Sequence, residues 1–527
     1  MTRWGMTVDL NRCVGCQTCT IACKHANATP PGVQWRKVID VELGTFPDVE
    51  RLFVVTGCQH CDEPPCVPVC PSGATAKRSD GLVTIDYDMC IGCASCVVAC
   101  PYQARTIVHE KEYYYTGRAT AQELQRPHEE RLGVANKCTF CIERIDDGLA
   151  AGLTPGKDME ATPACVASCI AQALKFGDYD DSDSEVSRIV RDNNTFQMHE
   201  ELGTNPQIRY LYEVPESMPG RDADADVASL ADPANPLVGK RQRYWDYRAA
   251  MNFALGGMAS GLGIIAWITH LMGLLNTSSL QGANLAAAGI MAIGLFFVFL
   301  KLGRKGRFLK VLLRPQTSWM TRETYCVAAF FPAVGLSLLW PHPILFALAG
   351  LAAAGFLFAQ GQILYSAKGI PSWRAPQVPW MLMATGLFEG VGLLALIAAG
   401  LDVSAHLGSI LPTFGVGLAM ISGYQLLSYK WSGPENSIGP LAMADINYLA
   451  PIILGAAYAV PGILFAIANA VPGVDVLAGL MAVGSGFFWK FMLVTRICHQ
   501  QGFALAKVPQ RGSGTRAAPA RMGHDAA

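Results

Sequence analysis

Cysteine residues carry the chemistry that this sequence can perform, and most of the eighteen follow one spacing. Between Met89 and Pro101, four of them form a Cys-x2-Cys-x2-Cys-x3-Cys run that ends in proline. Three thiolates at this spacing can bind three corners of a [4Fe-4S] cluster, while the fourth ligates a different cluster. The run therefore predicts iron-sulfur ligation and implies a second group of cysteines.

Three further groups of cysteines supply the expected partners. One precedes Pro71 and has a third gap widened by Glu63, Pro64 and Pro65. The N-terminal run repeats the spacing without a proline. Its expected partner is a set of two close pairs, 138/141 and 165/169, separated by a longer stretch of sequence. Exchange of the fourth ligand between neighbouring runs predicts four clusters. We name the ligand groups set 1 (Cys13, Cys16, Cys19, Cys169), set 2 (Cys23, Cys138, Cys141, Cys165), set 3 (Cys58, Cys61, Cys66, Cys100) and set 4 (Cys70, Cys90, Cys93, Cys96).

Two other uses of cysteine compete with this interpretation. A disulfide framework belongs in short secreted chains, and residues 1 to 12 show neither an apolar core nor a twin arginine. The pairs 138/141 and 165/169, taken alone, could form a zinc site, although three four-cysteine runs stand beside them. Cys326 and Cys498 lie in apolar surroundings and are expected to be packing residues.

Charge divides the 527 residues into two unlike halves. Up to Trp245 there are 24 Lys and Arg against 34 Asp and Glu, whereas residues 246 to 500 contain 13 against 7. An acidic half joined to a sparsely charged half with basic flanks favours a membrane protein over a nucleic-acid binder. We expect an iron-sulfur domain at 1–215, a linker with a basic and aromatic collar at 216–245, a membrane anchor at 246–500 and a disordered tail at 501–527.

The iron-sulfur domain should contain short strands that lead into the cluster loops, at Arg51 to Thr56, Leu82 to Asp86 and Glu112 to Tyr115. The expected fold class is therefore α+β ferredoxin-like units joined to an all-α bundle. Eight apolar segments are long enough, or nearly so, to cross a bilayer. They lie near 249–275, 283–300, 324–340, 344–366, 378–401, 407–429, 446–470 and 474–496.

The connections between these segments predict their orientation. Those after segments two, four and six carry all the loop lysines and arginines, and those after one, three, five and seven carry none. The positive-inside rule then puts the even-numbered loops, the iron-sulfur domain and both termini in the cytoplasm, with the anchor in the cytoplasmic (inner) membrane. Cluster thiolates also favour a reducing compartment.

Polar residues inside the predicted segments are candidates for function. Glu389, in the middle of the fifth segment, predicts a proton path or a quinone contact, or else a protonated glutamate bonded between helices. Near the cytoplasmic ends, hydrogen-bonding groups are candidates for holding a quinone carbonyl; these are Asp445, Asn447, Arg496 and His499. Most polar residues at these ends, including Arg322, Glu323 and Lys490, are candidates for snorkelling anchors. His270 is the only histidine well inside a predicted segment, so a haem with two histidine ligands is not expected.

Residues 1 to about 180 resemble the four-cluster iron-sulfur subunit of the molybdopterin oxidoreductases of the dimethyl sulfoxide reductase family. The four sets carry this resemblance, including the widened gap between Cys61 and Cys66. It implies four [4Fe-4S] clusters, because relatives that replace a cysteine hold a three-iron cluster and here all sixteen are present. In the family the catalytic partner docks on the side of set 1, and sets 3 and 4 lie nearer the membrane.

Residues 246 to 500 are similar to the eight-helix anchor of the same enzymes, which lacks haem and exchanges electrons with quinone. The stretches Ser318 to Glu323, Gln500 to Phe503 and Pro509 to Gly512 carry this resemblance. The family usually keeps the two halves as separate subunits, and the fusion here departs from that pattern. A cytoplasm-facing complex is similar to the sulfite dehydrogenase and phenylacetyl-CoA:acceptor oxidoreductase branches.

The function predicted from the sequence is electron transfer between a large catalytic subunit, which holds a molybdenum or tungsten pterin, and membrane quinone. Nothing in this chain could bind the pterin itself. Two other functions stay open: a ferredoxin-coupled or ion-translocating quinone reductase without a molybdenum partner, and a redox-regulatory membrane protein. A co-purifying molybdopterin subunit distinguishes the first function from the second.

Overall fold

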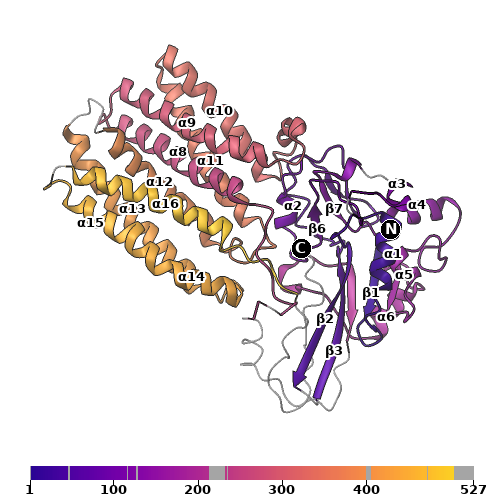
Figure 1. Cartoon of the computed structure of the whole chain (residues 1–527). Helices are drawn as coiled ribbons and strands as arrows, with labels where there is room; N and C mark the ends of the chain where they lie inside the picture. The colour runs from indigo at the N-terminus through magenta and orange to yellow at the C-terminus, as the bar shows by residue number, and fades with distance from the viewer. Residues whose placement is uncertain are drawn as a thin grey trace. The chain divides into compact units, whose positions relative to one another are not determined.

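The computed structural model describes residues 2–45, 48–115, 117–125, 129–212, 232–233, 235–398, 405–471 and 473–503. The chain forms two compact units, one of Met1–Lys240 with Gln500–Ala527 and the other of Arg241–His499. We call them the cysteine-rich unit and the helical unit (Figure 1). Much of the expected linker and nearly all of the expected tail lie outside the described residues, so these two predictions stay untested.

A four-stranded sheet in the cysteine-rich unit is formed by the first strand of the unit and its last three strands. Its strand order is β8-β1-β10-β9, with β1 parallel to β10 and antiparallel to β8. Met6 and Val8 of β1 are fully buried. The strands are β1 (Trp4–Asp9), β8 (Leu174–Asp178), β9 (Thr195–Phe196) and β10 (Ile208–Leu211). This sheet holds the first and last parts of the unit together, which brings Cys13 and Cys169 into the same region.

Hairpins connect the cysteine loops between these ends. The longest joins β2 (Arg36–Thr45) to β3 (Asp48–Gly57), and Figure 1 shows it as two long arrows. Two short antiparallel pairs follow, β4 (Thr75–Lys77) with β5 (Val83–Ile85) and β6 (Arg105–Ile107) with β7 (Ala135–Lys137). The helices are α1 (Thr18–Asn27), α2 (Ser95–Val98), α3 (Ala121–Gln125), η1 (Glu129–Arg131), α4 (Ile142–Ala150), α5 (Ala164–Ala167), α6 (Glu185–Asp192) and η2 (Glu200–Leu202).

The strand expected at Glu112 to Tyr115 is wrong. This segment pairs only through an isolated bridge between Tyr115 and Arg118 among the described residues. The backbone N–H of Tyr114 donates to Glu123 Oε1 at 3.0 Å, and Lys24 lies 5.4 Å from the centre of the Tyr114 ring. Three adjacent tyrosines have strand propensity, but the described part of the unit provides no neighbouring strand to pair with them.

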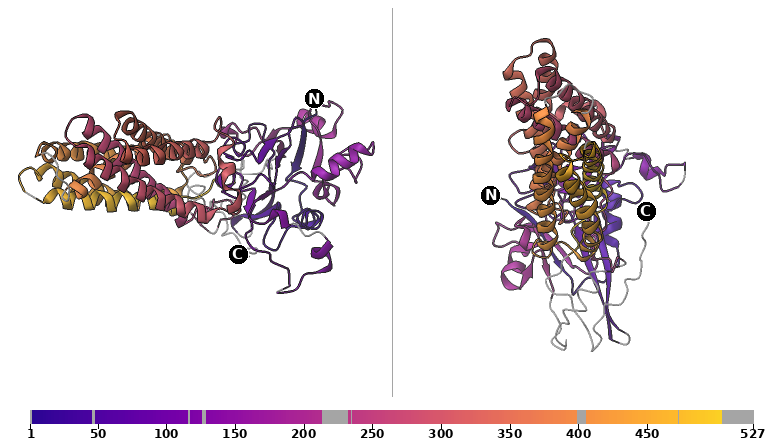
Figure 2. Two further views of the ribbon diagram at one scale, coloured as in Figure 1. Left: turned by 90° about the horizontal axis from the view of Figure 1, so that it is seen from above. Right: turned by 90° about the vertical axis from the view of Figure 1, so that its left-hand side faces the viewer.

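The helical unit is a bundle whose long helices lie side by side in both views of Figure 2. Helix α8 is central, because it packs against α9, α11, α12 and α16. The elements are α8 (Tyr247–Leu271), α9 (Thr277–Lys301), η3 (Lys305–Leu312), α10 (Trp319–Leu339), α11 (Pro343–Tyr365), α12 (Gln377–Ala398), α13 (Ala405–Trp431), α14 (Pro440–Ile453), η4 (Leu454–Ala459), α15 (Val460–Ile467) and α16 (Val474–Thr495).

These elements fall where the apolar segments were predicted, and the fold class is confirmed. Among the described residues, seven helices are long and apolar enough to cross a membrane, with α14, η4 and α15 counted as one. The remaining segment, α10, does not meet that standard. It contains Arg322, Glu323 and Pro332, which lower its apolar character.

A π-helical turn interrupts the seventh segment at Leu454–Ala459. Pro461 lies just beyond it, and a proline has no N–H to donate to the carbonyl four residues earlier. The π turn accommodates this missing bond without ending the helix. It also contains Tyr458, whose buried hydroxyl lies 2.9 Å from Thr385 Oγ1 of α12.

Candidate functional site

All eighteen cysteines are free thiols, and most of those in the four sets are buried. Within the sets only Cys16 is exposed, while Cys13, Cys93 and Cys169 are partly buried. So many thiols in one small unit, without disulfides, are suited to binding a soft metal. The question is whether the structure groups them as the spacing predicts.

Thiols of set 3 and of set 4 form two neighbouring groups. Burial, with repulsion from Cys66 and Cys58, raises the pKa of Cys100 to about 11. Burial likewise raises the pKa of Cys93 to about 11, and there the interacting thiols are Cys70 and Cys90. The fourth cysteine of each run thus lies with the first three of the other run, as the predicted exchange requires.

Sets 1 and 2 show the same exchange across a much longer stretch of sequence. Burial, opposed by Arg36 and reinforced by Cys165, Cys13 and Cys169, raises the pKa of Cys19 to about 11. Burial also raises the pKa of Cys23, which lies near Cys138, Cys165 and Cys141 of its own set. The side-chain amide of Asn27 is 3.7 Å from Cys23 Sγ and 3.8 Å from Cys141 Sγ.

A repeated backbone contact surrounds these thiols. The N–H two residues after a cysteine hydrogen-bonds to its sulfur at Cys13, Cys16, Cys90, Cys93 and Cys138. Hydrogen bonds to the sulfurs stabilise bound thiolates and tune cluster potentials. The turns have positive φ at Gly15 (66°) and Gly92 (71°), and a Cβ on Gly15 would lie 2.4 Å from the Phe53 ring. Glycine is therefore required at Gly15 for both reasons.

Each set offers four thiols, which is the number that a [4Fe-4S] cluster binds. Within the described residues, no three His, Cys, Asp or Glu side chains are close enough together to hold one ion. A cubane cluster separates its four thiolates because each binds a different corner.

Electrostatic interactions between thiols of different sets give the order of the sets, which we call the line of four sets. Cys19 of set 1 interacts with Cys165 of set 2, Cys138 of set 2 with Cys58 of set 3, and Cys66 of set 3 with Cys96 of set 4. The spatial order is therefore set 1, set 2, set 3 and set 4. Neighbouring sets are close enough for their charges to interact.

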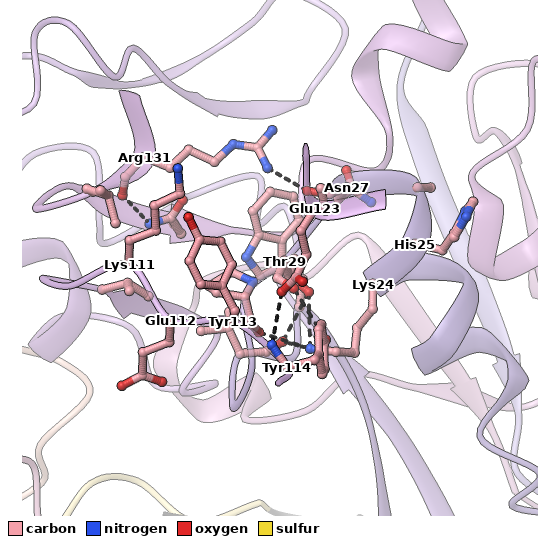
Figure 3. A pocket seen from close by; sticks show the side chains of 18 of the residues that line it. Lys24, His25, Asn27, Thr29, Lys111, Glu112, Tyr113, Tyr114, Glu123 and Arg131 are labelled. Atoms are coloured by element: carbon pink, nitrogen blue, oxygen red, sulfur yellow. Dashed lines mark hydrogen bonds between the residues drawn. The ribbon is translucent and has the colours of Figure 1, made fainter. Parts of the chain in front are cut away.

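Figure 3 shows a cavity of the cysteine-rich unit. Its volume is about 1210 Å³, and Cys141 of set 2 is among the residues that line it. Tyr113, Tyr114 and Arg131 form part of its wall, and Figure 3 shows the Tyr114 backbone bonded to Glu123. The two tyrosines come from the segment that was expected to be a strand. The cavity gives solvent access toward set 2.

The helical unit contains a second polar site at the points where the chain enters and leaves it. Asp445 of α14 is buried and accepts from Arg241 Nη2 at 2.9 Å and from Arg496 Nε at 3.0 Å. His499 Nδ1 lies 4.0 Å from Asp445 Oδ2 and has no hydrogen-bond partner among the described residues. The structure thus brings together three of the quinone candidates, whereas Asn447 is exposed on α14.

Glu389 of α12 belongs to a different group. It forms an ion pair with Lys490 of α16, and both side chains are fully buried. Lys490, one of the candidate anchors, does not snorkel, because its side chain is fully buried and its ammonium also donates to the Ala254 carbonyl at 3.0 Å. Glu389 Oε1 has no hydrogen-bond partner in the described part of the chain.

Two glycines make room for this pair. A Cβ on Gly257 would lie 2.5 Å from Lys490 Nζ, and one on Gly486 would lie 2.5 Å from Glu389 Oε1. Elsewhere in the bundle, the side-chain amide of Asn252 is 3.3 Å from the buried carboxylate of Glu323. The interior of the bundle therefore contains several charged and amide side chains; Glu389 and Asp445 were selected from the sequence as functional candidates, whereas Asn252 was not.

His270 lies in the last turn of α8 and not well inside it, because α8 ends at Leu271. Its Nδ1 is 2.7 Å from the Leu275 carbonyl oxygen.

Comparisons with known proteins identify relatives of the cysteine-rich unit among iron-sulfur proteins. Residues 49–117, which contain all eight cysteines of the two middle runs, match the family described as a 4Fe-4S dicluster domain. A selenate reductase subunit of Mesobacillus selenatarsenatis is 40% identical over 40% of this chain and 72% of its own length. A sulfite dehydrogenase subunit of Allochromatium vinosum is 38% identical over 40% of this chain and 83% of its own length.

A further relative is the arsenate respiratory reductase iron-sulfur subunit of a Shewanella species, which is 36% identical over 40% of this chain and 96% of its own length. These relatives are matched over most of their length, while more than half of this chain lies outside each match. The chain therefore belongs to the family of iron-sulfur subunits of molybdopterin oxidoreductases of the dimethyl sulfoxide reductase type.

Proposed function

We propose that this chain passes electrons between a catalytic molybdenum or tungsten subunit and the membrane quinone pool, through four [4Fe-4S] clusters held by sets 1 to 4. The line of four thiol groups in spatial order is the observation that carries this proposal. Bound clusters would supply one-electron transfer steps between successive sets. The substrate chemistry then belongs to the partner subunit.

The protein's own contribution in the cysteine-rich unit is to hold and shield the thiols. Burial excludes water from most of them, and backbone N–H groups donate to their sulfurs. In the family the catalytic partner docks on the side of set 1, where Cys16 is exposed. We therefore propose that electrons are exchanged with the partner at set 1.

For quinone, we propose the Asp445 site of the helical unit. Quinone reduction takes up two electrons and two protons, so its carbonyl oxygens need donors nearby. Asp445 holds the guanidinium groups of Arg241 and Arg496 in place, and His499 Nδ1 is free of a hydrogen bond within the described residues. Asn447 and the buried Glu389 complete the proposed set, Glu389 as a proton-exchanging group distinct from the Asp445 site.

The membrane arrangement is also part of the proposal. The apolar helices would anchor the chain in the cytoplasmic membrane, with the basic even-numbered loops and the iron-sulfur domain on the cytoplasmic side. The domain limits proposed are 1–215, 216–245, 246–500 and 501–527. We propose that the helical unit binds no haem.

Anaerobic purification of the chain from its native membrane tests the main claim. We expect about sixteen irons per chain and molybdenum or tungsten on a large co-purifying polypeptide. Sixteen irons with neither that metal nor that polypeptide would instead favour a quinone reductase that acts without a molybdenum partner. Fewer irons would contradict the assignment of four clusters.

The quinone site is tested separately with Asp445→Asn. This change leaves the side chain similar in size but removes the charge that holds two arginines. We expect a higher KM for quinone, while electron transfer to a soluble dye that accepts directly from the clusters stays unchanged. Glu435→Gln, at an exposed carboxylate of the same unit, is the matched control. An unchanged KM in the Asp445 variant would remove this site from consideration.

A further inference from the structure

Three basic side chains are buried inside the cysteine-rich unit. Arg36 begins β2, Arg105 begins β6 and Lys137 ends β7. Their exposed fractions are 0%, 2% and 0%. A buried charge is costly unless an opposite charge or several hydrogen bonds compensate for it. The partners of these three side chains are therefore informative.

The hydrogen bonds of two of these cations go to sulfur, hydroxyl and carbonyl groups. Arg105 Nη2 donates to Cys66 Sγ at 3.0 Å and its Nη1 to Thr75 Oγ1 at 3.1 Å. Lys137 donates to the Cys138 carbonyl at 2.8 Å and to the Val83 carbonyl. These partners leave the positive charge itself without a carboxylate to balance it in the described part of the chain.

Arg36 has even fewer protein partners. Its Nη2 is 3.4 Å from Met6 Sδ, and its Nε and Nη1 have no partner among the described residues. A fully buried guanidinium with two unused nitrogens requires an anion nearby. The adjacent sets of thiols, once they hold clusters as thiolates, would provide it.

The charge of each cation interacts with thiols of two sets. The charge of Arg36 acts on Cys19 of set 1 and on Cys23, Cys138 and Cys165 of set 2. That of Lys137 acts on Cys138 of set 2 and on Cys58 and Cys66 of set 3. That of Arg105 acts on Cys58, Cys66 and Cys100 of set 3 and on Cys96 of set 4. One cation is therefore found at each of the three junctions in the line of four sets.

We propose that Arg36, Lys137 and Arg105 are positioning residues for electron transfer, each raising the reduction potential of the two clusters between which it lies. The inference rests on the proposed function, because it requires four clusters. Reduction adds one negative charge to a cluster, and a fixed cation nearby stabilises the reduced form. Burial keeps water and salt from screening that attraction.

Redox titration of the complete chain, purified with its partners and followed by electron paramagnetic resonance, tests this inference. Arg36→Gln should lower the potentials of the clusters of sets 1 and 2, Lys137→Gln those of sets 2 and 3, and Arg105→Gln those of sets 3 and 4. Reduced neighbouring clusters couple magnetically, and the pattern of this coupling in the spectra identifies which two clusters have shifted potentials. Arg188→Gln, at an exposed arginine of α6 in the same unit, should leave all four potentials unchanged.

A second series keeps the charge. Arg105→Lys and Lys137→Arg should restore the potentials toward the native values, which a merely space-filling role would not predict. If Arg105→Gln loses iron, Arg105→Lys still tests the inference. A lysine keeps the charge but holds it farther from Cys66, so the potentials of the clusters of sets 3 and 4 should fall only slightly below the native values.

The results distinguish this inference from the proposed function. Four clusters with unchanged potentials in every glutamine variant would overturn the inference and leave the proposed function intact. Shifts of equal size in all four clusters would also overturn it, because the effect would not be local to a junction. A native protein without four clusters would overturn the proposed function itself.

Discussion

The buried pair of Glu389 and Lys490 makes a quantitative prediction for the helical unit. Both side chains are fully buried, and Lys490 also donates to the Ala254 carbonyl. Lys490→Met leaves an unpaired carboxylate in the bundle, and Glu389→Leu leaves an unpaired ammonium. Removing one partner of a buried ion pair costs about 3–5 kcal/mol. A charged residue at the centre of a membrane helix costs about 2.5–3.5 kcal/mol on insertion scales, which is a similar value.

The double variant Glu389→Leu with Lys490→Met separates the pair from its surroundings. Replacing both charges by apolar groups of similar volume is often neutral or stabilising by about 1–4 kcal/mol. We therefore expect the double variant to be more stable than either single variant. In a double-mutant cycle, this difference appears as a large coupling energy between the two positions.

The assay is thermal unfolding of the purified complex in detergent, followed by the loss of helical circular dichroism. For a domain of this size, about 1 kcal/mol changes Tm by roughly 2–4 °C. Each single variant should therefore lower Tm by roughly 6–20 °C. Glu435→Gln, an exposed carboxylate of the same unit, should change Tm by less than about 2 °C. Single variants as stable as the native protein, or a double variant whose loss equals the sum of the two, would refute a coupled buried pair.

Three further outcomes follow from the sites described. Cys96→Ala should remove about one to four irons per chain, whereas Cys326→Ala, outside the four sets, should remove none, as measured by iron analysis. Gly15→Ala should reduce cluster content in set 1, because the left-handed backbone alone costs about 1–3 kcal/mol and the new Cβ also meets the Phe53 ring. Burial and a neighbouring guanidinium, opposed by a carboxylate, lower the pKa of His499 below 6.5. The unfolded chain then takes up a proton that the folded chain does not, so stability should fall as the pH drops below about 6.5, and His499→Gln should weaken this dependence in pH-dependent melting.

The sequence predicts the long elements well because their signal is local. Runs of about twenty apolar residues place the helices within six residues of their observed limits. Strand pairing is not local, and Glu112 to Tyr115 shows this, since its strand propensity meets no partner strand in the described part of the unit. The role of Lys490 could not be assigned from the sequence for a similar reason. Its nearness to the end of a segment suggests snorkelling, and only the packing of α12 against α16 reveals the carboxylate that it meets.

The buried cations show a limit of a different kind. Arg36, Arg105 and Lys137 lie in strands, and the sequence pattern alone would predict that these basic side chains are exposed. The signal that could have found them is their position beside cysteine groups, since Lys137 directly precedes Cys138 and Arg105 follows Cys100 by five residues. Proximity in the sequence does not show that a cation interacts with two sets, because the thiols of the second set come from a distant part of the chain.

The line of four sets also has a functional consequence that the order of the sequence conceals. Cys13 and Cys169 are the first and last cysteines of the cysteine-rich unit, yet both belong to set 1 at one end of the line. The cysteines between residues 58 and 100, in the middle of the cysteine-rich stretch, supply sets 3 and 4 at the other end. The contacts join set 1 to set 2, set 2 to set 3 and set 3 to set 4, so electrons should follow that order. We expect the loss of a cluster in either middle set to block quinone reduction while the clusters on the partner's side are still reduced by substrate.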